Sequence, residues 1–486
     1  MLHSIFSAGS SRELILSKFQ MSSLIDFDPN LGFFNMKCLT LLDFSDNNIS
    51  ELPSTINLLQ NLEILNASKN RIKEIPVNMV DLVNLKHIDL SKNALIKFPD
   101  EFVQYSRLKE LQLSTNNITS LPIKLNLLHQ MEFLSVSDNG IREMPEDISQ
   151  LDSIRMINFS KCSLISLPST IGCLENLTHL IVPDNRITTF PGSIGSCKRL
   201  RVINAGRNKL ERLPNSFCDS TNLEFVDLRQ NRLLNLTQYL GRLTRLTTLL
   251  ISNNTLINTS KSLNRCHLLR SLDLSHNNLD ERSLQDCIIP SCTSLNFSNN
   301  GIKHVQKLSF GTTSCLNSLS FEANEIILFP LDACNLECLT DLRFSNNRLH
   351  ALPHDIGKLT LLQTMRLDNN RFVILPSSIS RLRLLSELHM DSNRIKEVCE
   401  EIGDCDCLKE LLLHSNEIET LPVSLQALTN LRLLTLSNNQ FCTFPSVLES
   451  LVDINEVWLQ NQKTGILLSV PYYYRATMKN LELLML

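Results

Sequence analysis

Residues 408–422 have the sequence LKELLLHSNEIETLP, and this stretch decides the fold. Leu411 and Leu413 stand two residues apart, so both point to the same side of a short strand. Asn416 then interrupts the apolar set with an amide that can donate and accept hydrogen bonds. We expect it to be buried in a bend, paired with backbone groups. Pro422 fixes φ and suits the turn that leaves the strand.

The same frame, Leu-x-x-Leu-x-Leu-x-x-Asn, recurs with a period of 23 residues, and its places are numbered one to nine below. The first-place residues are Leu39, Leu62, Leu85, Leu108, Met131, Ile154, Leu177, Leu200, Leu223, Leu246, Leu269 and Cys292, followed after one inserted residue by Leu316, Leu339, Leu362, Leu385, Leu408 and Leu431. These are 18 units, and a nineteenth, degenerate unit begins at Ile454 with Gln462 in place of asparagine. One such unit cannot bury its own apolar face, so neighbouring units must stack.

The pattern predicts an α/β solenoid of about 18–19 repeats, with a parallel β-sheet on the concave face and short helices or turns on the convex face. Residues 1–38 are expected to form an N-terminal cap with a degenerate repeat, 39–462 the array, and 463–486 a C-terminal cap or tail. Met478, Leu481 and Leu484 are about three residues apart and favour a closing helix there. Within the array, residues 236–315 lose the Leu-Pro signature. This irregular island is either a distinct surface or tolerated drift of the outer turns.

Composition argues against several classes of protein. The net charge of −4, the single Trp and the five Tyr give no basic patch or base-stacking platform, so we expect no nucleic acid as partner. The longest apolar runs are far below the roughly 18 residues of a membrane helix. The N-terminus has no basic start followed by a sustained apolar run, so a signal peptide is not expected.

The 15 cysteines mostly occupy or flank repeat positions, as small buried apolar residues do. Cys162 stands where asparagine belongs. Cys405 and Cys407 have no second pair at metal-ligand spacing, so a zinc site there is not expected. Reduced thiols and a cytoplasmic location are the better interpretation.

No catalytic signature is present. The sequence contains no phosphate-binding glycine loop ending in Lys-Ser/Thr, no His-Glu-x-x-His and no Gly-x-Ser-x-Gly. A repeat sheet offers a broad open surface rather than a closed pocket with convergent groups. We therefore expect a protein that is not an enzyme and needs no cofactor or metal.

Binding is expected on the concave face, where the third, fifth and seventh places are free of packing constraints. Third-place residues in the middle of the array form an apolar column, to which two fifth-place residues, Ile181 and Leu250, are added. A contiguous apolar column on a wet face marks an interaction surface, although single exposed apolar residues are ordinary. The third-place members are Phe133, Met156, His179, Val202 and Phe225.

A second candidate surface lies toward the C-terminal end. Leu412, Leu433 and Trp458 are expected side by side on successive strands, with His389 and His414 adjacent. Tryptophan is enriched at binding hot spots. The alternative is that the C-terminal cap folds over Trp458.

Charged residues accompany these apolar ones. Arg343 and Arg366 are predicted neighbours, flanked by Asp341 and Asp368. Such a mixed site suits a charged protein partner and could set its register and association rate. The alternative is pairing of these charges with one another across strands.

The frame, with joins such as Leu52-Pro53-Ser54-Thr55-Ile56, resembles the intracellular leucine-rich repeats of the Shoc-type Ras scaffolds and of the LAP proteins (Scribble, Erbin, densin). The resemblance covers residues 39 to about 462. Residues 454–462, INEVWLQNQ, are similar to the last LAP repeat, Trp-Leu-x-x-Asn-Gln, but here the asparagine comes one residue early. The PDZ domains of LAP proteins and a Lys/Arg-Val-x-Phe phosphatase-docking motif are both absent from this sequence.

The resemblance implies a horseshoe-shaped leucine-rich repeat solenoid and a non-enzymatic intracellular scaffold in small-GTPase (Ras-type) signalling or cell-polarity assemblies. The implied partner is a small GTPase or a phosphatase subunit. We expect a monomer in the cytoplasm, with any association with the plasma membrane made through its partners. Two alternatives stay open: a regulatory subunit that targets a protein phosphatase or kinase, and an extracellular recognition receptor.

Overall fold

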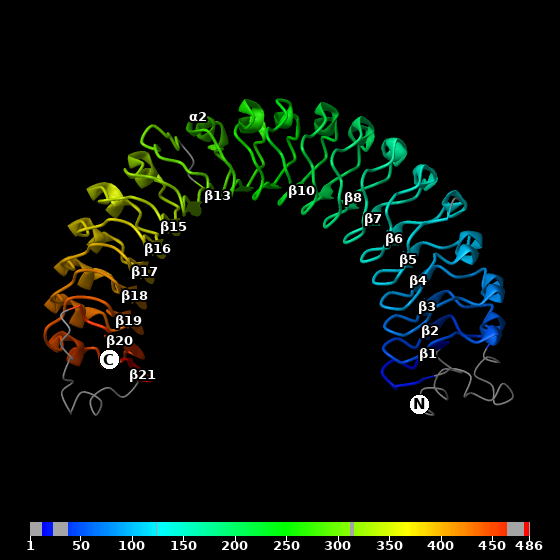
Figure 1. Ribbon diagram of the computed structural model, residues 1–486, viewed down its shortest axis with the longest axis horizontal. Helices are drawn as coiled ribbons and strands as arrows, with labels where there is room; N and C mark the ends of the chain where they lie inside the picture. Colours follow the sequence, from blue (N-terminus) through cyan, green and yellow to red (C-terminus); the bar gives the residue numbers. More distant parts are fainter. Residues whose placement is uncertain (1–11, 23–36, 123, 312–314, 464–480, 486) are drawn as a thin grey trace. The chain divides into compact units, whose positions relative to one another are not determined.

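The computed structural model describes residues 12–22, 37–122, 124–311, 315–463 and 481–485. It contains two compact units, residues 1–246 and 247–486, which are described separately. In each unit, three-residue strands line the inner side and short 3-10 helices lie on the outer side (Figure 1). The apolar core lies between these two layers.

Among the described residues of the first unit, ten parallel strands pair in sequence order. They are β1 (Glu13–Ile15), β2 (Leu41–Asp43), β3 (Ile64–Asn66), β4 (His87–Asp89), β5 (Glu110–Gln112), β6 (Phe133–Ser135), β7 (Met156–Asn158), β8 (His179–Ile181), β9 (Val202–Asn204) and β10 (Phe225–Asp227). The outer 3-10 helices are η1 (Ser54–Leu58), η2 (Val77–Asp81), η3 (Asp100–Gln104), η4 (Leu125–Leu127), η5 (Glu146–Gln150), η6 (Ser169–Cys173), η7 (Gly192–Ser196), η8 (Asn215–Asp219) and η9 (Leu240–Arg242).

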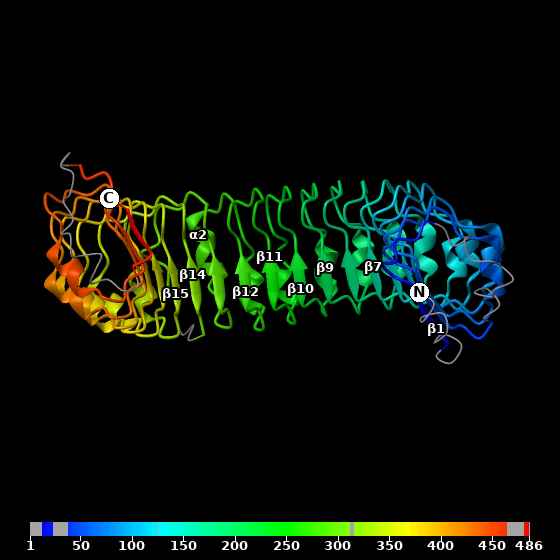
Figure 2. The same cartoon turned by 90° about the horizontal axis from the view of Figure 1, so that it is seen from below.

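In the second unit, strands β11 to β21 also pair in parallel and in sequence order; in Figure 2, β11 lies beside β12 and β14 beside β15. They are β11 (Thr248–Leu250), β12 (Ser271–Asp273), β13 (Ser294–Asn296), β14 (Ser318–Ser320), β15 (Asp341–Arg343), β16 (Thr364–Arg366), β17 (Glu387–His389), β18 (Glu410–Leu412), β19 (Leu433–Thr435), β20 (Glu456–Trp458) and β21 (Leu483–Met485). The outer helices are η10 (Lys261–Arg265), α2 (Glu281–Leu284), η11 (Gln285–Cys287), η12 (Leu331–Asn335), η13 (His354–Lys358), η14 (Ser377–Arg381), η15 (Glu400–Asp404), η16 (Val423–Ala427) and η17 (Ser446–Ser450).

The repeat frame explains this two-layer packing. Leu408, Leu411 and Leu413, at places one, four and six, are fully buried. Pro422 precedes η16 with φ −69°, so the ring holds the extended conformation from which the 3-10 turn starts. The prediction of a leucine-rich repeat solenoid with a parallel sheet and short outer helices is thus confirmed.

A ladder of ninth-place asparagines joins each repeat to the one before it. Asn416 is fully buried, and its Nδ2 donates to the carbonyl oxygens of Met390 and Leu413, both at 3.0 Å. Its Oδ1 accepts from the Ile395 N–H at 3.0 Å. Because the side chain satisfies backbone groups in two repeats, it fixes the spacing between them.

The residue before each ladder asparagine has a left-handed backbone conformation. From Asp46 to Asn461, eighth-place residues have φ between 49° and 57°. This local bend turns the chain out of the strand and aims the ninth side chain inward. Non-glycine residues seldom adopt this conformation, so its recurrence at one place shows how strongly the neighbouring repeats impose it.

Glycines in the outer turns allow the backbones of successive repeats to approach closely. A Cβ on Gly195 would collide with the carbonyl oxygen of Ser216 in the next repeat. Gly403 stands in the same relation to Ser424, at 2.6 Å. The absent side chain therefore allows successive outer turns to pack closely.

The terminal repeats are degenerate but remain paired. Near the N-terminus, β1 pairs with β2, and Leu14 is buried. Gln462 replaces the ladder asparagine and still donates to Leu436 O at 3.2 Å and Leu459 O at 2.7 Å. The expected closing helix is wrong at Leu484, which lies in β21 beside β20 because main-chain pairing continues the sheet. Met478, the first member of that pattern, lies outside the described residues.

The irregular residues 236–315 change the outer layer. In the second unit, α2 precedes the 3-10 helix η11, and its N-cap is Asp280, whose side chain accepts from the Arg282 N–H at 3.0 Å. The inserted residue lies between β13 and β14, where Ser294 pairs with Ser318. None of the described helices has the length and apolar character needed to cross a bilayer.

Candidate binding surface

Places three, five and seven of the frame point away from the core and form what we call the strand face of each unit. On β17, Leu388 is fully buried while Glu387 and His389 on either side of it are half-buried. This alternation follows from the two-residue period of a strand. Since the core does not dictate strand-face residues, their chemistry reports on binding.

In the first unit, five third-place residues form a continuous line, the apolar row. Strand register places them directly beside one another on β6 to β10. All five are half-buried, and His179 Nδ1 lies 2.9 Å from Thr178 Oγ1. The row consists of Phe133, Met156, His179, Val202 and Phe225.

The two fifth-place residues predicted with this row are placed differently. Ile181 lies on β8 between Asn158 and Asn204, within the same sheet. Leu250 belongs to the second unit, where it lies opposite Asp273 on β12. Both are half-buried.

In the second unit, the strand face of β14 to β20 carries seven carboxylates and only two arginines, and we call it the acidic patch. On β6 to β10 the same places contain one carboxylate, Asp227, and one arginine, Arg229. The excess of negative charge thus sets β14 to β20 apart from β6 to β10. Its charged members are Glu322, Asp341, Arg343, Arg366, Asp368, Glu387, Asp391, Glu410 and Glu456.

Both arginines of the acidic patch pair with carboxylates of this chain. Arg343 Nε donates to Asp341 at 3.0 Å, a bond that raises the pKa of the guanidinium. Arg366 lies beside Arg343 in register, and its Nη2 is 3.4 Å from Glu387 Oε2. The alternative of self-pairing thus holds for these two cations, while among the described residues the other five carboxylates of the patch have no arginine or lysine within ion-pair distance.

Burial makes this negative charge costly. Loss of hydration raises the pKa of Glu322, against the opposing effect of Arg343. Loss of hydration also raises the pKa of Asp391, although His414 opposes that shift. A carboxylate that is partly dehydrated and near like charges favours an external cationic group.

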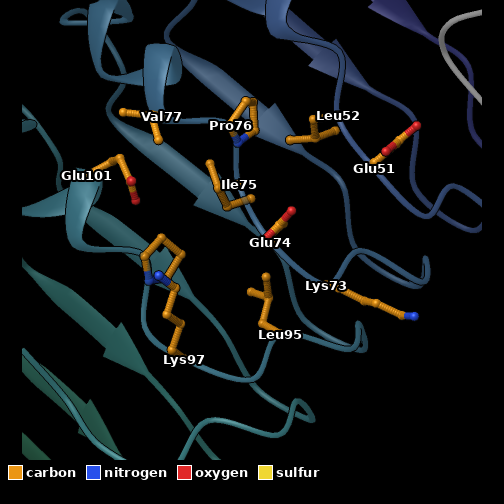
Figure 3. A pocket seen from close by; sticks show the side chains of 11 residues that line it. Glu51, Leu52, Lys73, Glu74, Ile75, Pro76, Val77, Leu95, Lys97 and Glu101 are labelled. Atoms are coloured by element: carbon orange, nitrogen blue, oxygen red, sulfur yellow. The ribbon is translucent and has the colours of Figure 1, made fainter.

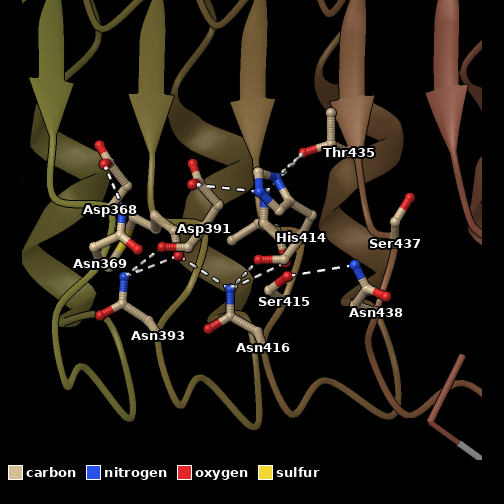
Figure 4. A network of polar contacts seen from close by, with 12 residues as sticks. Asp368, Asn369, Asp391, Asn393, His414, Ser415, Asn416, Thr435, Ser437 and Asn438 are labelled. Carbon is tan, nitrogen blue, oxygen red and sulfur yellow. Dashed lines mark hydrogen bonds and ion pairs between the residues drawn. The ribbon is translucent and has the colours of Figure 1, made fainter. Parts of the chain in front are cut away.

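Two predicted histidines lie inside the acidic patch. His414 Nε2 is 3.5 Å from Asp391 Oδ2, and its Nδ1 is 3.4 Å from Thr435 Oγ1 (Figure 4). His389 is more buried, with 15% of its side chain exposed and Nε2 3.8 Å from Glu410 Oε2. Each imidazole therefore faces a carboxylate on a neighbouring strand.

Apolar side chains stand at the C-terminal edge of the acidic patch, in an order that differs from the prediction. Leu412 and Trp458 share the fifth place, but Thr435 lies between them. Leu433 is in the third-place line, between Glu410 and Glu456. The expectation of three apolar side chains side by side overlooked that third and fifth places form separate lines.

Trp458 remains accessible at that edge. Its side chain is 38% exposed, and its indole N–H donates to Glu456 Oε2 at 3.3 Å. Met485 on β21 is its neighbour in register on the other side. An exposed indole beside carboxylates can pack against the apolar part of a cationic side chain.

Five carboxylates of the patch were not singled out from the sequence: Glu322, Glu387, Asp391, Glu410 and Glu456. All five stand at place three or seven of their repeats. The signal in the sequence is therefore the net charge at these places, summed over successive repeats.

Hollows also occur between outer turns. One open pocket in the first unit is lined by charged side chains such as Lys73, Glu74 and Glu101 around Pro76 (Figure 3). Another, near α2 in the second unit, includes Arg282. Both lie on turns between repeats rather than on the strand face.

A family model described as "Leucine rich repeat" matches residues 60–118, 175–233 and 383–441, and a second such model matches residues 268–289. No significant match was found among curated protein sequences.

Three solved structures illustrate the similarity of fold. A leucine-rich-repeat protein of Leptospira interrogans is 24% identical, covers 89% of this chain and 98% of its own, and gives a TM-score of 0.64. The Arabidopsis receptor kinase HAESA, in complex with the peptide hormone IDA and the co-receptor SERK1, is 23% identical over 97% of this chain and 82% of its own, with a TM-score of 0.62. YopM from Yersinia enterocolitica is 20% identical over 99% and 94%, also at 0.62. At these identities the likeness concerns the fold alone.

Proposed function

Because this chain is a leucine-rich repeat protein, we propose that it is a non-enzymatic protein-interaction scaffold that binds its partner on the strand face. Leucine-rich repeat domains bind protein partners, and the fold is typically a binding scaffold. The acidic patch is the proposed contact surface, and a positively charged surface of another protein is the proposed occupant.

The observation that carries this proposal is the excess of carboxylates on β14 to β20. Glu387 and Glu410 face each other directly on neighbouring strands, an arrangement that is unfavourable for like charges. A cationic partner would relieve this repulsion and would be steered toward the patch over long distances. Trp458 at the edge would supply the apolar anchor that charge alone lacks.

The proposed setting is inside the cell, in small-GTPase signalling or cell-polarity assemblies, as the resemblance of the repeats implies. The cysteines support this setting. Cys287 and Cys405 are buried thiols, and burial raises the pKa of each to about 12. Such thiols act as small apolar core residues and are compatible with a reducing compartment.

The test is affinity purification of the full chain followed by mass spectrometry, with matched variants. Trp458→Ala and the double variant Asp391→Asn/Glu456→Gln change the acidic patch. Val423→Ser changes an exposed position on the outer helix η16 and serves as control. We expect both patch variants to lose the same partner that the control retains.

Two further measurements complete this test. Binding of the identified partner should weaken as salt is raised, because screening reduces attraction between exposed charges. Unchanged capture by both patch variants, with far-UV spectra equal to wild type, would refute the acidic patch as the contact surface. Loss of the partner only in Phe225→Ala would assign the contact to the apolar row instead.

The same purification separates the alternatives. Phosphatase or kinase activity in the purified material, directed to one substrate, would favour a regulatory subunit. Titration of the unfolded, unreduced protein should give 15 thiols if the protein is intracellular. Oxidised cysteines would favour an extracellular receptor.

A further inference from the structure

Glu387, His389 and Glu410 each direct one ligand atom toward a common point on the strand face of β17 and β18. A carboxylate oxygen of each glutamate and one imidazole nitrogen all lie within 4.8 Å of one another. Across the described part of the chain, no other group of three such side chains meets in this way. The register sets the glutamates opposite each other, and His389 follows Glu387 on the same face.

The rest of the described protein satisfies this cluster only in part, through the contact of Arg366 with Glu387. The two facing carboxylates repel each other. His389 Nε2 is buried without a hydrogen-bond partner among the described groups, and Glu410 Oε2 at 3.8 Å is too distant to form one. A buried polar atom without a partner is rare and costly. One cation bound between the three groups would offset the repulsion between the carboxylates and give His389 Nε2 a partner.

We propose that Glu387, His389 and Glu410 bind a divalent transition-metal ion, with Zn²⁺ as the best fit. Zinc accepts imidazole nitrogen together with carboxylate oxygen and is satisfied by three protein ligands and one further group. That fourth position faces solvent on the strand face, so water or a donor atom from a bound protein would complete it.

The required movement is small. Bonds of about 2.0–2.2 Å place two ligand atoms of a tetrahedral zinc site about 3.4 Å apart. The ligand atoms now lie within 4.8 Å of one another, so their longest separation must shorten by at most about 1.4 Å. Rotation of the glutamate side chains can produce this change. Both glutamates are half-exposed, so the ion can enter from the strand face.

Arg366 is the neighbour that opposes metal binding. Its Nη2 lies 3.4 Å from Glu387 Oε2 and brings positive charge next to the proposed ion. The binding of zinc must displace this contact or leave it on the second oxygen of Glu387. Removal of the guanidinium should therefore strengthen zinc binding, whereas removal of a ligand should weaken it.

The experiment is calorimetric titration of the full chain with zinc chloride, after treatment with EDTA and removal of the chelator. Glu410→Gln and His389→Ala remove ligands, and the first keeps the shape of the side chain. His87→Ala is the matched control, since His87 Nδ1 also contacts a glutamate on the next strand, Glu110, at 3.1 Å. Far-UV spectra and thermal midpoints check that each variant is folded.

We expect wild type and His87→Ala to bind one more equivalent of zinc than the two ligand variants, or to bind that equivalent at least about tenfold more tightly. Zinc should raise the thermal midpoint of wild type more than that of Glu410→Gln. Arg366→Gln should bind zinc more tightly than wild type. Equal zinc binding by wild type, Glu410→Gln and His389→Ala would overturn the proposal and assign any bound zinc to the thiols. This inference does not depend on which protein partner binds.

Discussion

Replacement of one ladder asparagine should destabilise the second unit by an amount that the structure allows us to work out. In Asn416→Ala, the Met390 carbonyl keeps its bond from Asn393 Nδ2, and the Leu413 carbonyl keeps its bond from Asn439 Nδ2. These two acceptors therefore lose one of two donors each. The Ile395 N–H loses the acceptor Asn416 Oδ1, its one recorded partner.

Asn416 Nδ2 also donates to His414 O at 3.3 Å, but this longer bond matters little because the carbonyl keeps the Ser392 N–H at 2.9 Å. The magnitude follows mainly from the other three losses. A buried donor without an acceptor costs about 1–3 kcal/mol, and the two weakened carbonyls add roughly 0.5 kcal/mol each. We expect Asn416→Ala to lower the free energy of unfolding by about 2–4 kcal/mol. Asn416→Gln should cost less, because Gln462 makes the equivalent bonds in its own repeat. Asn416→Asp should cost most, since it turns a carboxylate oxygen toward two carbonyl oxygens.

The assay is urea denaturation followed by the fluorescence of Trp458, the one tryptophan of the chain, which lies in the same unit. Local fluorescence is preferable to a global signal because long repeat arrays need not unfold in a single step. Glu419→Ala, at an exposed position of the same repeat, is the control. A midpoint for Asn416→Ala equal to that of the control would refute the reasoning.

Three further predictions concern the repeats themselves. Cys162→Asn should raise the free energy of unfolding by about 1 kcal/mol in denaturant titration, because the thiol, which donates to Val136 O at 3.4 Å, is a weaker hydrogen-bonding group than the amide found at this place in other repeats; a fall would show that the site cannot accept the amide. Gly195→Ala should destabilise by about 1–3 kcal/mol through collision with the next repeat, whereas Gly192→Ala in the same turn should be nearly neutral, since its new Cβ meets no atom closer than 3.7 Å; equal midpoints would contradict the role of close approach. Burial raises the pKa of Cys287 to about 12, so the thiol ionises at lower pH in the unfolded chain than in the folded one, and the stability that it contributes is complete below about pH 9 and declines as pH rises toward 12. The urea midpoint of Cys287→Ala should therefore fall less steeply between about pH 9 and about pH 12 than that of wild type, and equal slopes would contradict this prediction.

The sequence predicted the fold well because one physical demand repeats at every unit. Leu411 and Leu413 must be buried and Asn416 must bond to backbone, so these letters recur and reveal the period. The sequence was less informative where main-chain pairing decides the structure. Leu484 sits in a pattern that suits a helix, yet the open edge of β20 offers it unpaired backbone groups, and a strand results.

The candidate surfaces were partly predictable for the same reason. The apolar row follows from one place in the frame, and the register preserves it. The acidic patch consists of residues from places three, five and seven of successive repeats, so it becomes visible only when the strands are aligned. Glu387 and Glu410, for example, face each other only in the register of β17 and β18. The orphaned His389 Nε2 is a matter of distance and burial, which no spacing rule reveals.

The asparagine ladder also has a direction in time. The Ile395 N–H donates to the side chain of Asn416, 21 positions later in the chain. The Asn416 amide in turn donates to the carbonyl oxygen of Met390, 26 positions earlier. During synthesis, each repeat that leaves the ribosome therefore completes the repeat made before it, while its own bend stays unfinished. We therefore expect a growing chain to end in one incomplete repeat and its repeats to be able to fold in order from the N-terminus as they are made.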